Sequence, residues 1–314
     1  MSSAFNEDDQ PGGDPRVGRD HQKALAYAAA QELSESDPLV GYSARVWAQV
    51  SLPYRDPGNV NYWERRNGPV TLTMRPALLT ALDGSRYEGF AYGLLPRHAL
   101  TWIATEAVQT QSPVLQLGSS MSSFMQKIGL AKGGRDAKRL TDQLQRLFGS
   151  QLQVRGLAMT DSGYGEKSQY FQIADAVQLW FSNDDELQGT RGLWASTVTL
   201  SDQFFRSIVD APIPVNLEAM KALGASPMRL DIYLWATYRA HTLETTARVT
   251  WAELNQQFGG QYGSLRQFKA QFVKNLREVQ IVYPELRVEV TGEHLVLRPS
   301  RPHAAEPKRR AELI

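Results

Sequence analysis

The sequence predicts an α+β protein, because helical and strand-like hydrophobic periods alternate along its 314 residues. One order of elements occurs twice, about 130 residues apart: long helix, short strand, short helix, turn, long helix, hairpin. The two copies share little residue identity, yet Trp102 and Trp235 stand at matching places in their first helices. This order is that of a winged helix-turn-helix. We therefore expect two such domains in tandem, of mainly helical content and with β-hairpin wings.

Composition and charge divide the chain into four predicted segments. Residues 1–40 carry eight acids against three bases and are expected to be largely disordered, apart from an Ala-rich helix over residues 22–35. Residues 41–185 form the first predicted winged-helix domain and residues 186–300 the second. Residues 301–314 are a tail without a periodic pattern.

In the first copy, strand-like alternation precedes the helical part. Apolar stripes at helical spacing indicate the helices, and glycine and serine indicate the turns. The expected elements are strands over residues 46–52 and 70–74, a helix over 97–109, a strand over 114–118, a short helix ending at Gly129, a helix over 135–148, and a hairpin that pairs 151–155 with 169–173.

The second copy repeats this order with clearer boundaries. The expected elements are a helix over residues 229–242, a strand over 248–250, a short helix that begins at Thr250 or Trp251 and ends at Gly259-Gly260, a helix over 265–279, and a hairpin around Thr291-Gly292-Glu293.

The last long helix of each copy carries basic residues on the face opposite its Leu and Phe residues, since a helix advances by about 100° per residue. A solvated helix face usually mixes both charges, but no acid lies between Arg266 and Arg277. We therefore predict that at least one of these helices contacts DNA, the alternative being that both faces are merely solvated. The candidate DNA-binding residues are Lys132, Arg135, Lys138, Arg139 and Arg146 in the first copy, and Ser264, Arg266, Gln267, Lys269, Gln271, Lys274 and Arg277 in the second.

These residue types fit two kinds of DNA contact. Lys and Arg neutralise phosphates and release counterions, which gives affinity without sequence preference. Residues near the start of a recognition helix read bases in the major groove. In the second copy, the candidates for base readout are Ser264, Arg266, Gln267 and Gln271.

Several classes of protein are disfavoured by what the sequence lacks. It has no Cys and no Gly-Lys dipeptide, which excludes thiolate sites and a P-loop. Its five His residues are not spaced as metal ligands, and it has no Gly-x-Ser-x-Gly nucleophile motif. We therefore expect no enzyme activity, no cofactor and no metal. The acid cluster Asp184-Asp185-Glu186 is interpreted as a solvated inter-domain linker, with metal-dependent DNA cleavage as the alternative.

No stretch of the sequence predicts a membrane span or a signal peptide. The longest uncharged run, residues 107–126, is half Ser, Thr and Gln. The N-terminus is acidic and lacks an apolar core. We expect a cytoplasmic bacterial protein without membrane contact.

At this point the sequence resembles a known family, the plasmid-encoded RepA replication initiators, which are architectural relatives of iteron-binding Rep proteins with tandem winged helices. The likeness covers roughly residues 85–300. Leu94-Leu95 adds an apolar pair to the family's Tyr-Gly turn segment. The segments that carry the resemblance are Tyr92-Gly93-Leu94-Leu95-Pro96-Arg97, LTWIATEAVQTQS, LQLGSSMSSFMQKIGL, Gly133-Gly134-Arg135, PIPVNLEAMKAL, SPMRLDIYLWATYR, VTWAELNQQFG and FKAQFVKNLREVQIVYPE.

The resemblance implies a plasmid replication initiator that binds repeated double-stranded origin sites (iterons) and helps to open the origin. It implies recruitment of a host initiator and the replicative helicase, and a homodimer in equilibrium with monomer that represses its own promoter. The first winged helix would dimerise and contact the DNA backbone. The second would give specific recognition through Arg266, Lys269, Lys274 and Arg277. A dimeric winged-helix transcriptional repressor without a replication role stays open as the alternative.

Overall fold

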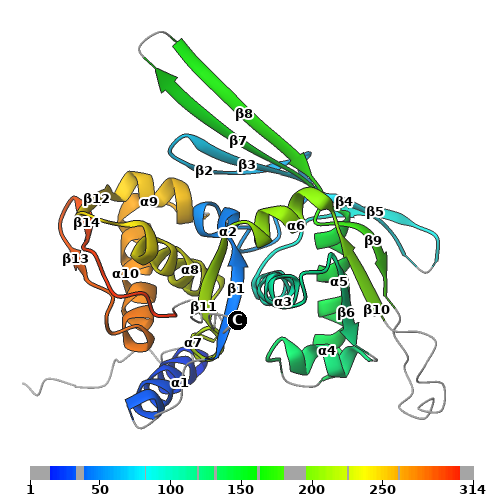
Figure 1. Cartoon of the computed structure of the whole chain (residues 1–314), viewed down its shortest axis with the longest axis horizontal. Coiled ribbons are helices and arrows are strands. Elements are labelled where there is room, and N and C mark those ends of the chain that lie inside the picture. Colours follow the sequence, from blue (N-terminus) through cyan, green and yellow to red (C-terminus); the bar gives the residue numbers. More distant parts are fainter. Residues whose placement is uncertain are drawn as a thin grey trace, which may run out of the picture.

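The computed structural model describes residues 15–32, 39–81, 83–118, 120–130, 133–160, 163–179, 196–224, 226–260 and 262–304. They form the predicted α+β fold, with small antiparallel sheets between helices. In Figure 1, α3 (Leu94–Thr110) and α8 (Pro227–Thr242) lie between α5 (Gly134–Gly149) on the right and α10 (Leu265–Val282) on the left. The two long helices that open the repeats are thus central, and the two that carry the basic faces are peripheral.

The second winged-helix unit has the predicted element order from α8 to β14. It continues with β12 (Ala247–Thr250), α9 (Trp251–Phe258), α10, β13 (Val288–Val290) and β14 (His294–Leu297). β14 is the middle strand, with Leu295 opposite both Val249 and Val290. Hydrogen bonds from the Thr250 hydroxyl and amide to Glu253 close a capping box at the start of α9 and lower the pKa of that carboxyl.

Glycine ends α9 where the sequence predicts it. A Cβ atom at Gly259 would collide with the carbonyl oxygen of Asn255. The chain can therefore leave the helix this closely only with glycine at this position, and the turn to α10 follows directly.

The first winged-helix unit runs from α3 to β10, with β6 (Val114–Gly118), α4 (Met121–Lys127), α5, β9 (Ala174–Gln178) and β10 (Ser196–Leu200). Here β10 is the middle strand, with Val198 opposite both Leu115 and Val177. Its sheet, β6-β10-β9, therefore has the same connectivity as β12-β14-β13 of the second unit.

The hairpin expected as the wing of the first unit forms, but in another sheet. It is β7 (Gln151–Thr160) with β8 (Gly163–Phe171), in which Val154 pairs with Gln169 as predicted. β7 also pairs with β3 (Val70–Arg75), and β2 (Trp63–Asn67) completes the sheet β2-β3-β7-β8. The reason is a shared apolar face, because Leu72 and Met74 on β3 are as buried as Leu152 on β7. This sheet projects from the body in Figure 1.

Two local predictions need correction. Residues 46–52, expected as a strand, contain the short helix α2 (Arg45–Gln49), because Trp47 and Ala48 are both buried and adjacent residues of a strand would point to opposite faces. The Ala-rich helix begins earlier than predicted, as α1 (Pro15–Glu32), with proline in its first turn. Within the stretch expected to be disordered, Asp20 is buried and lies 3.7 Å from Arg229.

Strands of the two predicted domains pair with each other. β1 (Val40–Ala44) pairs with β11 (Pro212–Asn216), and β10 joins the sheet of the first unit. The remaining elements are β4 (Ala77–Thr80), β5 (Arg86–Gly89), α6 (Asp202–Val209) and α7 (Leu217–Ala222).

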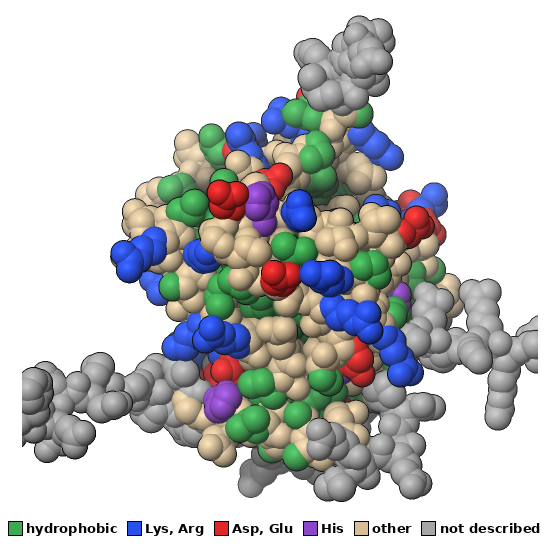
Figure 2. Space-filling view, turned by 90° about the vertical axis from the view of Figure 1, so that its left-hand side faces the viewer, with side chains coloured by type: hydrophobic (Ala, Val, Ile, Leu, Met, Phe, Trp, Pro, Cys, Tyr) green, Lys and Arg blue, Asp and Glu red, His purple; other side chains and the backbone are tan. Residues whose placement is uncertain are grey.

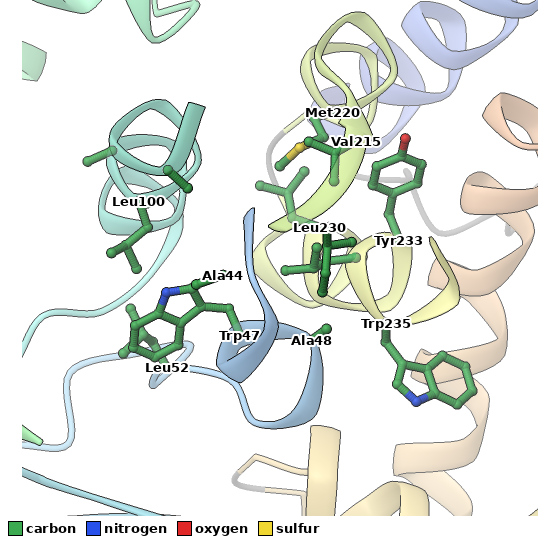
Figure 3. Packing of buried hydrophobic residues seen from close by; sticks show 14 of the residues in the cluster. Ala44, Trp47, Ala48, Leu52, Leu100, Val215, Met220, Leu230, Tyr233 and Trp235 are labelled. Atoms are coloured by element: carbon green, nitrogen blue, oxygen red, sulfur yellow. The ribbon is translucent and has the colours of Figure 1, made fainter. Parts of the chain in front are cut away.

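One hydrophobic cluster runs through both units. Figure 3 shows Trp47 of α2 and Leu100 of α3 in the same cluster as Leu230 and Trp235 of α8. A continuous core disfavours independent movement of the two units, because separating them would expose apolar surface to water. The recognition helices are therefore held at a fixed separation.

Candidate nucleic-acid interface

The α10 helix presents a basic and polar face outside the core. Its apolar face is buried, with Phe268, Phe272, Leu276 and Val279 all about 1% exposed or less. Five candidates predicted from the sequence are exposed on the other face: Arg266, Gln267, Gln271, Lys274 and Arg277. The structure therefore brings these side chains together on one surface of one helix.

Arg266, Lys274 and Arg277 form no ion pair with any residue that the structure describes. The one acid in the second half of α10, Glu278, is turned away and lies 3.1 Å from His21 of α1. The basic face is thus not neutralised by its own chain. Figure 2 shows this side of the molecule, where Lys and Arg side chains are spread widely and outnumber Asp and Glu.

Two of the polar candidates hold the start of α10. The Ser264 hydroxyl accepts a hydrogen bond from the amide of Gln267 at 3.3 Å, which caps the helix. The Gln267 side chain accepts a hydrogen bond from the amide of Gly263 at 3.1 Å. Both residues are exposed, so they stabilise the helix start at the place where bases would be read.

Lys269 has intramolecular partners. Its ammonium donates to the carbonyl oxygens of Thr291 and Gly292, at 2.8 and 2.9 Å, in the turn between β13 and β14. It also lies 4.6 Å from the centre of the Trp251 ring. Lys269 thus fastens the wing of the second unit to α10.

The α5 helix has the same division of faces. Leu140, Leu144 and Leu147 are buried, and Arg135, Lys138 and Arg139 are exposed. Arg139 lies 3.3 Å from Asp136, one turn earlier on the same helix. Lys132, in the turn before α5, lies outside the described residues.

Arg146 is the candidate most enclosed by its own chain. Its side chain is 15% exposed and lies 2.9 Å from Asp142 and 3.3 Å from Asp56. The guanidinium also donates to the carbonyl of Phe90 and lies over the Tyr92 ring. Its charge is therefore engaged with two carboxylates, and it ties α5 to the segments before α3.

One residue pair that fixes both helices escaped the sequence analysis. Arg97 of α3 and Asp231 of α8 form a two-bond ion pair at 2.8 Å, with side chains only 7% and 8% exposed. Arg97 also donates to the carbonyls of Leu52 and Gly93. Every buried hydrogen-bonding edge of this guanidinium is used, so it links the two units rigidly. The available signal was a charged residue on the apolar stripe of each central helix.

Two surveys of the described residues bear on other functions. No group of three His, Cys, Asp or Glu residues among them is arranged to hold a metal ion. None of the helices in this part of the chain is both long and apolar enough to cross a membrane. The Asp184-Asp185-Glu186 cluster lies outside the described residues.

The family whose description is "Plasmid encoded RepA protein" matches residues 90–253, which is more than half of the chain. The chain belongs to this family. The matched region begins just before α3 and ends within α9, so it covers the whole first unit of this RepA-family chain and the beginning of the second.

Two solved structures of domains 2 and 3 of RctB are also similar to the chain. One, of selenomethionine derivatives, is 15% identical, with a TM-score of 0.49, and the match covers 81% of this chain and 98% of the RctB chain. The other is 14% identical, with a TM-score of 0.46, and covers 81% and 96%. No curated protein matches the sequence.

Proposed function

We propose that this chain is a plasmid replication initiator that binds repeated double-stranded origin sites (iterons) through both winged helices. Membership of the RepA family supports a role in plasmid replication. The observation that carries the proposal is the exposed basic face of α10, whose Arg266, Lys274 and Arg277 form no ion pair with any described residue. Such a face suits a polyanion, because each phosphate contact releases counterions.

The second unit is assigned to specific recognition. Arg266, Gln267 and Gln271 lie in the first two turns of α10, where a recognition helix meets base edges. Lys274 and Arg277 lie further along and are assigned to phosphates. Lys269 has the indirect role of holding the wing turn.

The first unit is assigned to backbone contacts and dimerisation. Arg135, Lys138 and Arg139 are the exposed bases of α5 and would meet phosphates. Arg146 is left out of this contact set, because its guanidinium is engaged with Asp142 and Asp56.

Beyond binding, we propose that the bound protein promotes local origin opening, recruits the host initiator and replicative helicase, and represses its own promoter as a dimer. Opening would use strain in bent DNA, since neither a P-loop nor a thiolate site is present to supply covalent or ATP-driven chemistry. We propose a cytoplasmic bacterial location for all of these steps.

The test is a selection of duplexes from a random pool, followed by measurement of the mass of the complex that forms on the enriched duplex. The expected result is one motif of about two helical turns bound by a monomer. A palindrome bound only by a dimer, without melting of neighbouring AT-rich DNA, would instead establish the repressor. If no sequence is enriched, the proposal is wrong.

A further inference from the structure

Arg65 is a buried cation without an anion of its own. The residue is 7% exposed, and its guanidinium lies between the rings of Tyr54 and Trp63, at 5.3 and 5.0 Å from their centres. Its buried Nε has no hydrogen-bond partner. Burial lowers the pKa of Arg65, as expected for a cation that has lost water without gaining a carboxylate.

The acids nearest to Arg65 are already bound. Asp231 is held by both sides of the Arg97 guanidinium at 2.8 Å. Glu64, the neighbour of Arg65 in β2, lies 3.6 Å from Arg66 and accepts a hydrogen bond from Thr73. Within the described part of the chain, Arg65 therefore has no ion-pair partner. An unpaired buried charge is costly unless a ligand neutralises it.

A hollow of about 450 Å³ opens beside this guanidinium. Arg65 lines it, together with Arg55, Glu64 and the aromatic residues Tyr54, Tyr62, Trp63 and Tyr262. Arg55 is exposed, and Tyr62 is 56% exposed. The hollow therefore combines a deep cation, a second cation near the surface and apolar walls, which suits a phosphoryl anion attached to a sugar.

The position of the hollow favours DNA as the source of that anion. Gly259, Gly260 and Tyr262 form one wall, and they belong to the turn that joins α9 to α10. A DNA strand that passes the start of α10 would run beside this turn. Glycine on the wall lets a phosphate approach the backbone closely.

We propose that this hollow binds a backbone phosphate of the DNA engaged by α10, with Arg65 as the deep ligand and Arg55 at its mouth. The inference rests on the proposed DNA-binding function and adds a contact that lies outside the two recognition helices. The backbone strand would thereby be fixed to β2 and to the turn before α10 at once, which orients α10 in the groove.

The test compares Arg65→Met with Arg66→Met in the full-length chain. Arg66 is the matched control, because it is the next residue in β2, points to the opposite face and is exposed. First, inorganic phosphate is titrated against sodium chloride of equal ionic strength while the Tm is recorded. We expect phosphate to raise the Tm of wild type and Arg66→Met by about 2 °C and to leave that of Arg65→Met unchanged.

The second arm measures the affinity for the selected duplex over a range of salt concentrations. Arg65→Met should make the slope of log affinity against log salt shallower by about one unit more than Arg66→Met does. Its Tm in phosphate-free buffer should equal or exceed that of wild type, because an unpaired buried charge has been removed.

The outcomes separate the alternatives. If phosphate has no effect on the wild-type Tm, or an equal effect on both variants, the site does not exist. If phosphate binding requires Arg65 but the duplex slope does not change, the anion is a free phosphate or nucleotide, and the assignment to DNA is wrong. If phosphate binding requires Arg65 and no duplex is bound by any variant, the anion site stands while the proposed function fails. A Tm several degrees below wild type for Arg65→Met in phosphate-free buffer would show a structural residue instead.

Discussion

The two winged-helix units share one topology but use their basic helices differently. On α5, Arg139 and Arg146 lie near Asp136 and Asp142 of the same helix. On α10, only Lys269 is engaged, and its partners are the carbonyls of the wing turn. Carboxylates reduce the charge that α5 offers to phosphates, whereas α10 keeps its full charge. The comparison teaches that equal topology does not imply an equal share in recognition.

The largest expected effect comes from breaking the link between the units. Asp231→Ala leaves the Arg97 guanidinium buried and unpaired, which should lower the free energy of unfolding by about 3–5 kcal/mol. Urea denaturation measures this loss. The control is Asp202→Ala, whose pair with Arg206 is exposed on α6 and should contribute under about 1 kcal/mol. Equal effects of the two substitutions would show that the buried pair does not join the units.

The next prediction compares matching positions of the recognition helices. Arg266 is the second residue of α10, and Arg135 is the second residue of α5. Arg266→Ala should weaken binding of the selected duplex by about 1–3 kcal/mol and relax its sequence preference. Arg135→Ala should weaken selected and scrambled duplexes alike. Fluorescence anisotropy with both duplexes distinguishes the two, and relaxed specificity on Arg135→Ala alone would reverse the assignment.

A smaller effect is expected where α10 holds its wing. Lys269→Met removes two hydrogen bonds to the turn of Thr291 and Gly292, which should lower the free energy of unfolding by about 1 kcal/mol. Lys274→Met, on the same helix without an ion-pair partner among the described residues, should leave stability unchanged and reduce only DNA affinity. Thermal unfolding of both variants checks this. Unchanged stability in Lys269→Met would return that ammonium to the set of phosphate contacts.

The smallest effect belongs to the far end of α10. Arg277→Ala should weaken all duplexes evenly and make the salt slope shallower by about one unit, because one phosphate contact is lost. Affinity measured at several salt concentrations tests it. A change of sequence preference would mean that Arg277 contacts bases.

Local patterns predicted much of this architecture and of the site. The division of α5 and α10 into apolar and basic faces follows from helical spacing, and Gly259 ends α9 because of the carbonyl that it approaches. The wing of the first unit was not predictable in this way, because the pairing of β9 and β10 with β6 is a long-range contact. The same holds for Arg146, whose partner Asp56 is 90 residues away.

The most direct test of the account is the salt dependence of duplex binding in two triple variants. One replaces Arg266, Lys274 and Arg277 with alanine, and the other replaces Arg135, Lys138 and Arg139. The account predicts that each variant makes the slope shallower by about three units and that only the α10 variant loses preference for the selected sequence over a scrambled one. Slopes equal to that of wild type in both variants would show that the two basic faces are solvated surface, and would contradict the central claim.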